Sequence, residues 1–334
     1  LLLRSRLQAG ADTAIFIDSD SDMHADLNPV ADLAARHSVV ISPHVVKPFP
    51  RDGMGPNEWD LQKYGVFNSG FLAVGEEAAS FLDWMDDHVR RDCLFAEEVG
   101  MHADQRLLEW VPALFDHHVL RDPGVNVAHW NLHEREISES GGVYLCDGGP
   151  LRTFHFSGLD PEDTGVLTWQ LRQHANPRVD DRPAGALSRL LVDYQGRLVE
   201  AGYRDVGRVP YSYSASAAGR PLGQWERRAY REMVLAAEAL GRDAPPSPFD
   251  RSRSAEFERM LDDPGSIPWL SRPARSRIVD AELARPAEGE RLKRSATTGL
   301  RLARRAARRV TGRGHGWMPH PLPSDITMSE YPGQ

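Results

Sequence analysis

The amino-acid sequence predicts an α/β protein followed by a helical region. Two patterns support this class: short apolar runs alternate with helical periodicity up to about residue 160, and predicted helices dominate from residue 161 onward. The chain has 334 residues, of which 41% are hydrophobic and 26% are charged. That balance is typical of a folded globular protein and excludes a disordered, collagen-like or coiled-coil chain.

Three strands are predicted early in the chain, at residues 14–17, 39–41 and 66–74. The first is wholly apolar and ends in acidic residues, which indicates a strand buried in an α/β sheet. Asn28 followed by Pro29 predicts a helix start with Asn28 as the N-cap, and this helix ends near Arg36. Strand, helix and strand in this order predict a right-handed βαβ unit. Residues 43–60 predict a long loop.

The remaining elements follow from helical spacing and short apolar runs. Further helices are predicted at residues 1–7, 76–91, 104–110, 163–174, 185–201, 224–240, 255–261 and 291–309. Further strands are predicted around Val119 and at residues 143–145 and 152–156. The predicted organisation is a core at 1–160, a helical extension at 161–290, and a basic helix with a flexible tail at 291–334.

Composition excludes several classes of function. No apolar run approaches the roughly 18 residues of a membrane-spanning helix. Residues 1–160 carry 12 Lys and Arg against 26 Asp and Glu, the wrong sign for a nucleic-acid partner. Cys93 and Cys146 are too few for a disulfide framework and lack zinc-site spacing. A cytoplasmic enzyme is therefore expected.

Carboxylates cluster after the first predicted strand, at Asp18, Asp20 and Asp22. Open α/β sheets bind ligands at the carboxyl ends of their strands, and residues two apart on an extended chain face one side. Two carboxylates that face one point repel each other unless a cation lies between them, and oxygen ligands favour Mg²⁺ or Mn²⁺. The spacing alone fits an acidic turn before the next helix equally well.

A strand followed by Asp-x-Asp also begins the phosphatases that form an aspartyl-phosphate intermediate. Asp18 would then attack phosphorus and Asp20 would act as the general acid. That chemistry requires a small β-branched residue where Asp22 stands, and a later lysine with a second acidic pair. This sequence offers no convincing match for the last requirement, so the phosphatase is the weaker alternative.

Three further motifs follow the acid pair: Phe67-Asn68-Ser69-Gly70, Asp104-Gln105 and His155-Phe156-Ser157-Gly158. In order and spacing, this set resembles the retaining GT-A glycosyltransferases of the glycogenin and lipopolysaccharide galactosyltransferase group. The resemblance covers about residues 10–160 and implies a GT-A-like mixed sheet. In that fold, strands and helices that hold the nucleotide base precede the Asp-x-Asp strand. The resemblance therefore implies a chain truncated before its nucleotide-binding part.

The resemblance also implies transfer of a sugar from a nucleotide-sugar donor, with retention at the reacting carbon. It implies Asp18, Asp20 and His155 as ligands of Mn²⁺ or Mg²⁺, which would neutralise the charge on the leaving diphosphate. Asp104 and Gln105 would bind the donor sugar at its reacting face. The other implied donor contacts are Asn68, Ser69, Gly70 and Gly158. Structural roles are the alternatives: a core histidine at His155, a strand bulge at Asn68 and a helix N-cap at Asp104.

The acceptor is left open between a polysaccharide, a lipid-linked molecule and a small molecule. His44, His129 and His133 are candidate contacts to acceptor or phosphate, although a lone histidine near a loop is more often structural. The basic segment at 291–310 is a candidate contact to anionic lipid at the inner face of the plasma membrane, with a solvated helix as the commoner explanation. The alternative from another class is a non-catalytic, transferase-like module of a larger protein.

Overall fold

The computed structural model describes residues 2–96 and 100–263. The chain divides into two compact units, Leu1–Tyr211 and Ser212–Gln334. The described residues form a mixed α/β protein in which strands and helices alternate through the first unit. The predicted basic helix at 291–309 and the tail behind it lie outside the described residues. No described helix has the length and apolar character needed to cross a membrane.

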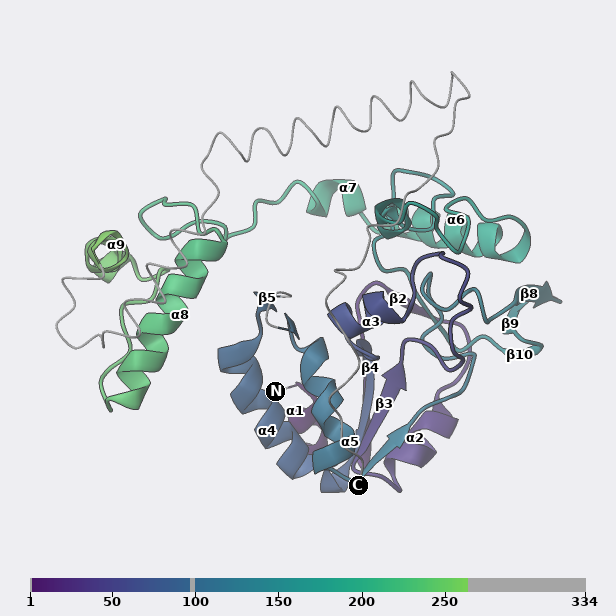
Figure 1. The fold of residues 1–334 in the computed structure, drawn as a ribbon, viewed down its shortest axis with the longest axis horizontal. Helices are drawn as coiled ribbons and strands as arrows, with labels where there is room; N and C mark the ends of the chain where they lie inside the picture. The colour runs from purple at the N-terminus through teal and green to yellow at the C-terminus, as the bar shows by residue number, and fades with distance from the viewer. Residues whose placement is uncertain (1, 97–99, 264–334) are drawn as a thin grey trace, which may run out of the picture. The chain divides into compact units, whose positions relative to one another are not determined.

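The main sheet of the first unit has four strands in the order β1-β4-β3-β7, and Figure 1 labels its two central strands, β4 and β3. These strands are β1 (Thr13–Ile17), β3 (Val39–Pro43), β4 (Phe67–Gly75) and β7 (His117–Val119). β4 is antiparallel to both β1 and β3, whereas β3 and β7 are parallel. The predicted βαβ unit is therefore split. The helix at residues 28–34 connects β1 to β3, which run in the same direction, but β4 lies between these two strands.

The first strand differs from its prediction. All five residues of β1 are partly exposed, whereas all five residues of β3 are buried. β1 is at the edge of the sheet as described, so β4 is the one strand that pairs with it there. The apolar sequence of β1 correctly predicted a strand, but complete burial was wrong because burial depends on neighbours on both sides.

Helices cover both faces of the main sheet (Figure 1). Side chains alternate along each strand, so Val40 and Ala73 pack with α2 (Asn28–Ala34), whereas Ile41 and Val74 pack with α4 (Ala79–Asp92). The α4 face also contains the 3₁₀ helix Gln105–Trp110 and α5 (Val111–Leu114). This arrangement gives the sheet two apolar cores of the kind expected for an α/β protein.

Two helix starts correct the sequence-based predictions. The N-cap of α2 is Leu27, and Asn28 is the first helical residue, with no side chain capping the helix. The predicted loop at 43–60 gives way to α3 (Glu58–Tyr64), which was not predicted. Asn57 begins this helix with a capping box: its side chain accepts from the backbone N–H of Trp59, and Asp60 accepts from that of Asn57.

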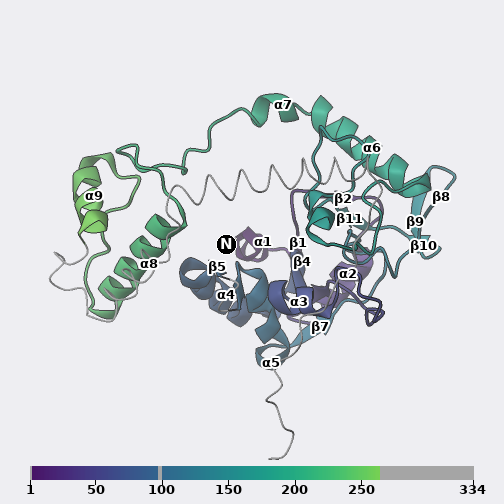
Figure 2. The same cartoon turned by 45° about the horizontal axis from the view of Figure 1, so that its top comes forward.

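A second group of strands packs with α6 (Gly185–Glu200) in the first unit. β2 (Ser21–Met23) pairs with β11 (Thr153–His155), and Figure 2 shows the two strands together near α6. Phe156, just beyond β11, stacks on Tyr194 of α6 with ring centroids 3.8 Å apart. A three-stranded meander lies against α6 and consists of β8 (Ile137–Ser140), β9 (Val143–Cys146) and β10 (Gly149–Pro150).

The helix predicted at 163–174 is largely absent. The structure has a 3₁₀ helix at Trp169–Gln173, which begins after Thr168 caps the backbone N–H of Gln170. Gly165 interrupts the predicted helix because it adopts a left-handed φ of 78°. The remaining elements of the unit are α1 (Leu2–Gln8), the 3₁₀ turn Glu76–Ala78, β5 (Phe95–Ala96), β6 (Met101–His102) and α7 (Tyr203–Val206).

The described part of the second unit, up to residue 263, contains two helices close to their predicted positions, α8 (Gln224–Ala239) and α9 (Ser254–Asp262). A 3₁₀ turn, Arg251–Arg253, precedes α9. The helices share a small apolar core of Leu222, Trp225, Ala229, Met233, Phe257 and Leu261. The residues that the sequence singled out as chemical candidates lie in the first unit.

Candidate metal centre

Two strand ends create the acidic turn and place a histidine beside it. Asp18 follows β1, and its backbone N–H donates to the carbonyl of Gly70 over 2.9 Å. The turn closes when Ser21 N–H donates to the Asp18 carbonyl over 3.0 Å, and β2 then begins. Pairing of β2 with β11 places His155 opposite Ser21. The β2–β11 pair therefore joins segments that are distant in sequence.

The three predicted metal ligands lie together. The Nε2 atom of His155 is 3.1 Å from Oδ1 of Asp20 and 3.8 Å from Oδ2 of Asp18, and one ligand atom from each residue lies within 4.8 Å of the others. His155 is 4% exposed, while the Asp18 and Asp20 side chains are 40% and 48% exposed. Mg²⁺ holds its ligands at roughly 2.1 Å, so neighbouring ligand atoms lie about 3 Å apart. The spacing and donor types fit a divalent cation.

The carboxyl groups of the cluster influence each other's charge. Burial raises the pKa of Asp18, His155 lowers it, and the charges of Asp20 and Asp104 raise it. Burial also acts to raise the pKa of Asp20, but the hydrogen bond and charge of His155 outweigh it and hold the pKa below its usual range. The two pKa values move in opposite directions because the charge of Asp20 acts against that of Asp18, whereas His155 lies nearer to Asp20 and forms its hydrogen bond there. A bound cation would remove this repulsion.

A chain of amide side chains fixes the orientation of His155. The backbone N–H of Gly70 donates to Oδ1 of Asn68 over 3.0 Å, and the same oxygen accepts from Nδ2 of Asn126 over 3.1 Å. Oδ1 of Asn126 therefore faces Nδ1 of His155, at 3.3 Å. Since an amide oxygen only accepts, Nδ1 carries a proton, and Nε2 faces the carboxylates. Nε2 is therefore the nitrogen that could bind a metal.

Asn68 is the centre of this network. Its Nδ2 donates to Oε1 of Gln105 over 3.1 Å and to Nε2 of His44 over 3.3 Å. Nδ1 of His44 donates in turn to the Val66 carbonyl over 3.1 Å. Asn68 is buried, and its two donors and its acceptor oxygen are all used within the protein. The residue predicted to contact the donor sugar thus positions its neighbours, with its polar groups already occupied.

Gly70 is a glycine for reasons of space. A Cβ atom there would lie 2.5 Å from Cε1 of His155, 2.7 Å from Oδ2 of Asp18 and 2.8 Å from Oδ1 of Asn68. Real Cβ atoms do not approach other atoms so closely, so any side chain would displace two proposed ligands and the amide that supports them. Gly70 therefore lets β4 pass directly behind the cluster of Asp18, Asp20 and His155.

The other predicted site residues surround this network. Asp104 stands at the N-cap position of the 3₁₀ helix but makes no capping hydrogen bond with its side chain. Gln105 is buried; it accepts from the Ser69 backbone N–H over 3.3 Å and donates to the Tyr64 carbonyl over 2.9 Å. Gly158 lies in the turn after β11 with φ of 73°. Asp104 alone among these has a carboxylate that acts on Asp18 through its charge.

A cleft of about 340 Å³ adjoins the buried network. Its floor includes His44, Asn68, Gln105, His129 and Trp130. The Trp130 ring lies edge-on to His155 with centroids 5.2 Å apart, so the cleft reaches the residue beside the metal cluster. His133, the third histidine singled out from the sequence, instead stacks on Phe49 at a centroid distance of 4.6 Å and lines a different pocket.

The segment that supports the centre from behind was not predicted from the sequence. Asn126, at a left-handed φ of 52°, orients His155, and Asn131 donates to the carbonyls of His44 and Asn126 over 2.9 and 3.1 Å. Trp130 lies between these two asparagines in the sequence. This segment has neither helical nor strand periodicity, and two asparagines lie close to an aromatic residue. That combination could have indicated a buried polar turn.

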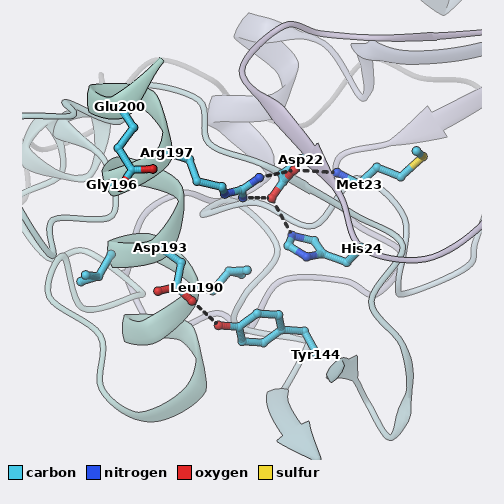
Figure 3. A pocket seen from close by; sticks show the side chains of 10 residues that line it. Asp22, Met23, His24, Tyr144, Leu190, Asp193, Gly196, Arg197 and Glu200 are labelled. Atoms are coloured by element: carbon cyan, nitrogen blue, oxygen red, sulfur yellow. Dashed lines mark hydrogen bonds and ion pairs between the residues drawn. The ribbon is translucent and has the colours of Figure 1, made fainter. Parts of the chain in front are cut away.

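A second pocket, of about 570 Å³, contains the third carboxylate of the acidic turn (Figure 3). Asp22 forms ion pairs with Arg197 and with His24, and Tyr144 donates to Asp193 over 3.2 Å. Asp22 is opposite Phe154 in the β2–β11 pair, one residue away from His155. Because successive side chains point to opposite faces, Asp22 faces away from His155 and is not a ligand of the same centre.

Two curated proteins of Bacillus subtilis (strain 168) are similar to part of this chain. One, described as "Uncharacterized protein YfnF", is 31% identical over 150 residues, which cover 43% of this chain and 48% of that protein. The other, "Uncharacterized protein YfnD", is 32% identical over 120 residues, covering 32% of this chain and 37% of that protein. Each match spans less than half of the relative. No family model and no solved structure matches.

Proposed function

We propose that this chain carries the site of a metal-dependent glycosyltransferase with a GT-A-like core. The observation that carries the proposal is the cluster of Asp18, Asp20 and His155, with Nε2 of His155 facing both carboxylates. The order of motifs along the chain supports it, because the backbone N–H of Asp18 donates to the Gly70 carbonyl and the charge of Asp104 raises the pKa of Asp18. The mixed sheet, with antiparallel β4 beside β1, is compatible with a GT-A-like core.

The proposed reaction transfers a sugar from a nucleotide-sugar donor to an acceptor hydroxyl. Asp18, Asp20 and His155 would hold Mn²⁺ or Mg²⁺, which as a Lewis acid offsets the negative charge that develops on the leaving diphosphate. Asn126 holds the Nδ1 proton of His155, so that Nε2 faces Asp18 and Asp20, and Gly70 lets the ligands lie close to β4. Asp104 would contact the donor sugar beside the reacting carbon.

We also propose retention of configuration. In such a transfer, the acceptor oxygen bonds to the anomeric carbon on the face from which the diphosphate oxygen departs, and the acceptor proton passes to that phosphate. Two of the four histidines that line the cleft are poor bases, since burial lowers the pKa of His44 to about 4 and that of His129 to about 3. A route that uses the leaving phosphate as the proton acceptor requires neither of them.

Binding and turnover test this function separately. Calorimetric titration with Mn²⁺ should show one site that is lost in Asp20→Ala. Nucleoside diphosphate release from UDP-, GDP-, ADP- and dTDP-sugars should require Mn²⁺ or Mg²⁺ and stop in EDTA. Asp104→Asn should slow turnover by about 100-fold, roughly 2.7 kcal/mol of transition-state stabilisation, and leave Mn²⁺ affinity unchanged. Asp32→Asn, an exposed carboxylate on α2, is the matched control.

The alternatives give different results in the same assays. A phosphatase would hydrolyse p-nitrophenyl phosphate in a way that depends on Asp18 and not on Asp104. A non-catalytic module would bind Mn²⁺ or a nucleotide sugar and release no product from any donor. Unchanged Mn²⁺ binding in Asp20→Ala would remove the metal centre itself and with it the proposed reaction.

A further inference from the structure

We propose that the cleft beside the metal centre binds an uncharged sugar ring and that His129 forms hydrogen bonds with its hydroxyl groups. This inference rests on the proposed function and names its substrate class: a neutral hexose or deoxyhexose, in preference to a uronic acid or a sugar phosphate. Three features of the cleft carry it, namely the charges of its lining, the unused polar atoms of His129 and its aromatic walls.

The cleft contains no arginine or lysine among its described lining residues. Its carboxylate belongs to Asp60, and Nδ1 of His174 lies 4.0 Å from Oδ2 of Asp60. The lining comprises His44, Pro56, Asp60, Leu61, Tyr64, Asn68, His102, Gln105, His129, Trp130, Ser157, Trp169, Gln170, Gln173 and His174. An anionic sugar would lose its hydration here without gaining a bidentate cationic partner, which is costly.

His129 supplies a polar group that has no hydrogen-bond partner among the residues that the structure describes. It is 8% exposed, and no hydrogen bond joins its imidazole to another residue in the described part of the chain. Burial lowers its pKa to about 3, so the ring is neutral at pH 7 and offers one N–H donor and one acceptor nitrogen. A hydroxyl group both donates and accepts and can therefore use both ring nitrogens, whereas a carboxylate can accept from the N–H only and leaves the acceptor nitrogen unpaired.

Aromatic side chains form the apolar part of the cleft. Trp130 and Tyr64 line it, and Trp169 stands at its edge with 53% of its surface exposed. Small-molecule sites combine aromatic surfaces with a few placed polar groups and occupy roughly 300–1,000 Å³, so a cleft of about 340 Å³ suits a small ligand. The C–H faces of a sugar ring can pack on these indoles while its hydroxyls reach His129.

Fluorine NMR of protein labelled with 5-fluorotryptophan tests the inference without metal or nucleotide. Trp130→Phe and Trp169→Phe assign the two cleft resonances. The probes are methyl glucoside, galactoside and mannoside, each titrated beside the corresponding uronate, which differs by oxidation of C6 to a carboxylate. We expect at least one uncharged glycoside to shift both resonances saturably, with at least tenfold tighter binding than its uronate. Equal or tighter uronate binding, or no shift with any glycoside, would overturn the inference.

Two sets of variants separate recognition from folding. His129→Leu should weaken glycoside binding at least tenfold, and His129→Gln, which keeps a donor and an acceptor, should restore most of it. Gln173→Arg adds a cation at an exposed position of the cleft and should strengthen uronate binding at least tenfold. Gln62→Arg, an exposed position outside the lining, should change neither affinity. If Gln173→Arg leaves uronate affinity unchanged, charge does not determine the selectivity of the cleft.

The two proposals fail in distinguishable ways. Glycoside binding at the cleft with no turnover of any nucleotide sugar would contradict the proposed function and leave the sugar site standing. Metal-dependent turnover confined to uronic-acid donors and acceptors would support the transferase and contradict the inference.

Discussion

The two ends of the main sheet are built from the same strands but differ in their side chains. At one end, Val39–Ile41 of β3 pair with Leu72–Val74 of β4, and apolar side chains pack on both faces. At the other end, Ser42 pairs with Asn68, and a buried polar network leads to the metal cluster. The strand register shifts between Ile41 and Ser42, so the irregularity lies where the apolar end gives way to the polar end.

The comparison shows how this sheet accommodates buried polar groups. An unpaired buried donor or acceptor costs roughly 1–3 kcal/mol, so a partly satisfied network would destabilise the fold. Asn68 avoids this cost because all of its polar groups have partners, and Asn126 contacts both Asn68 and His155. The apolar end therefore supplies stability, and the polar end keeps the ligands of the candidate metal centre in fixed positions.

The largest effect is expected from breaking the apolar end. Phe81 of α4 is fully buried against β3 and β4, and its ring lies 5.5 Å from that of Phe115. Phe81→Ala should lower the free energy of unfolding by about 3–5 kcal/mol, measured by urea denaturation. Mn²⁺ affinity of the folded fraction should stay unchanged. A matching loss of Mn²⁺ affinity would show that the two ends are not independent.

Gly70→Ala should disrupt the candidate metal centre at the polar end of the sheet. The new Cβ would have to push aside His155 and Asp18, so we expect Mn²⁺ affinity to fall by about 100-fold, roughly 2.7 kcal/mol, measured by calorimetry. Gly196→Ala is the control, because a Cβ at that position within α6 meets no atom within 4 Å. It should leave Mn²⁺ affinity unchanged and raise stability slightly, since glycine is unfavourable within helices. Full Mn²⁺ affinity in Gly70→Ala would show that the cluster is not held against β4.

Local patterns in the sequence predicted many elements of the first unit, but they did not predict which elements lie side by side in the fold. The apolar runs of β3 and β4 and the helical spacing of α4 and α6 are local properties, so these elements were predicted close to their observed bounds. The exposed side of β1 and the position of β4 between β1 and β3 were not predictable in this way. They depend on which strands pair, which no short window of sequence contains.

The candidate site divides in the same way. Asp18, Asp20 and His155 could be proposed from motif order, and the structure brings their ligand atoms together. Asn126 could not, because its contribution depends on a left-handed backbone and on side chains contributed by β4 and β11. The capping box of Asn57 was local and readable in the sequence, and the proline-rich surroundings led to a loop being predicted instead.

The smallest predicted effect is a loss of folding stability at lower pH, which originates in the polar end of the sheet. Burial lowers the pKa of His44 from 6.5 to about 4, so between these values the unfolded chain binds a proton that the folded chain does not. Stability therefore falls as pH decreases through this window, by about 1.4 kcal/mol for this imidazole between pH 7.5 and pH 5.5. His24, His118, His129 and His133 act in the same direction because burial lowers their pKa values too. Urea denaturation in EDTA at both pH values measures the total.

His44→Gln isolates the contribution of one residue. Glutamine keeps a donor for the Val66 carbonyl and an acceptor for Asn68, but it does not titrate. Between pH 7.5 and pH 5.5, the variant should therefore lose about 1.4 kcal/mol less stability than the wild-type protein. The raised pKa of Asp18 acts in the opposite direction, stabilising the fold as pH falls, and cancels when the two proteins are compared. Equal pH dependence in wild type and His44→Gln would mean that His44 accepts a proton in the folded protein, and the polar end would then tolerate charge beside Asn68.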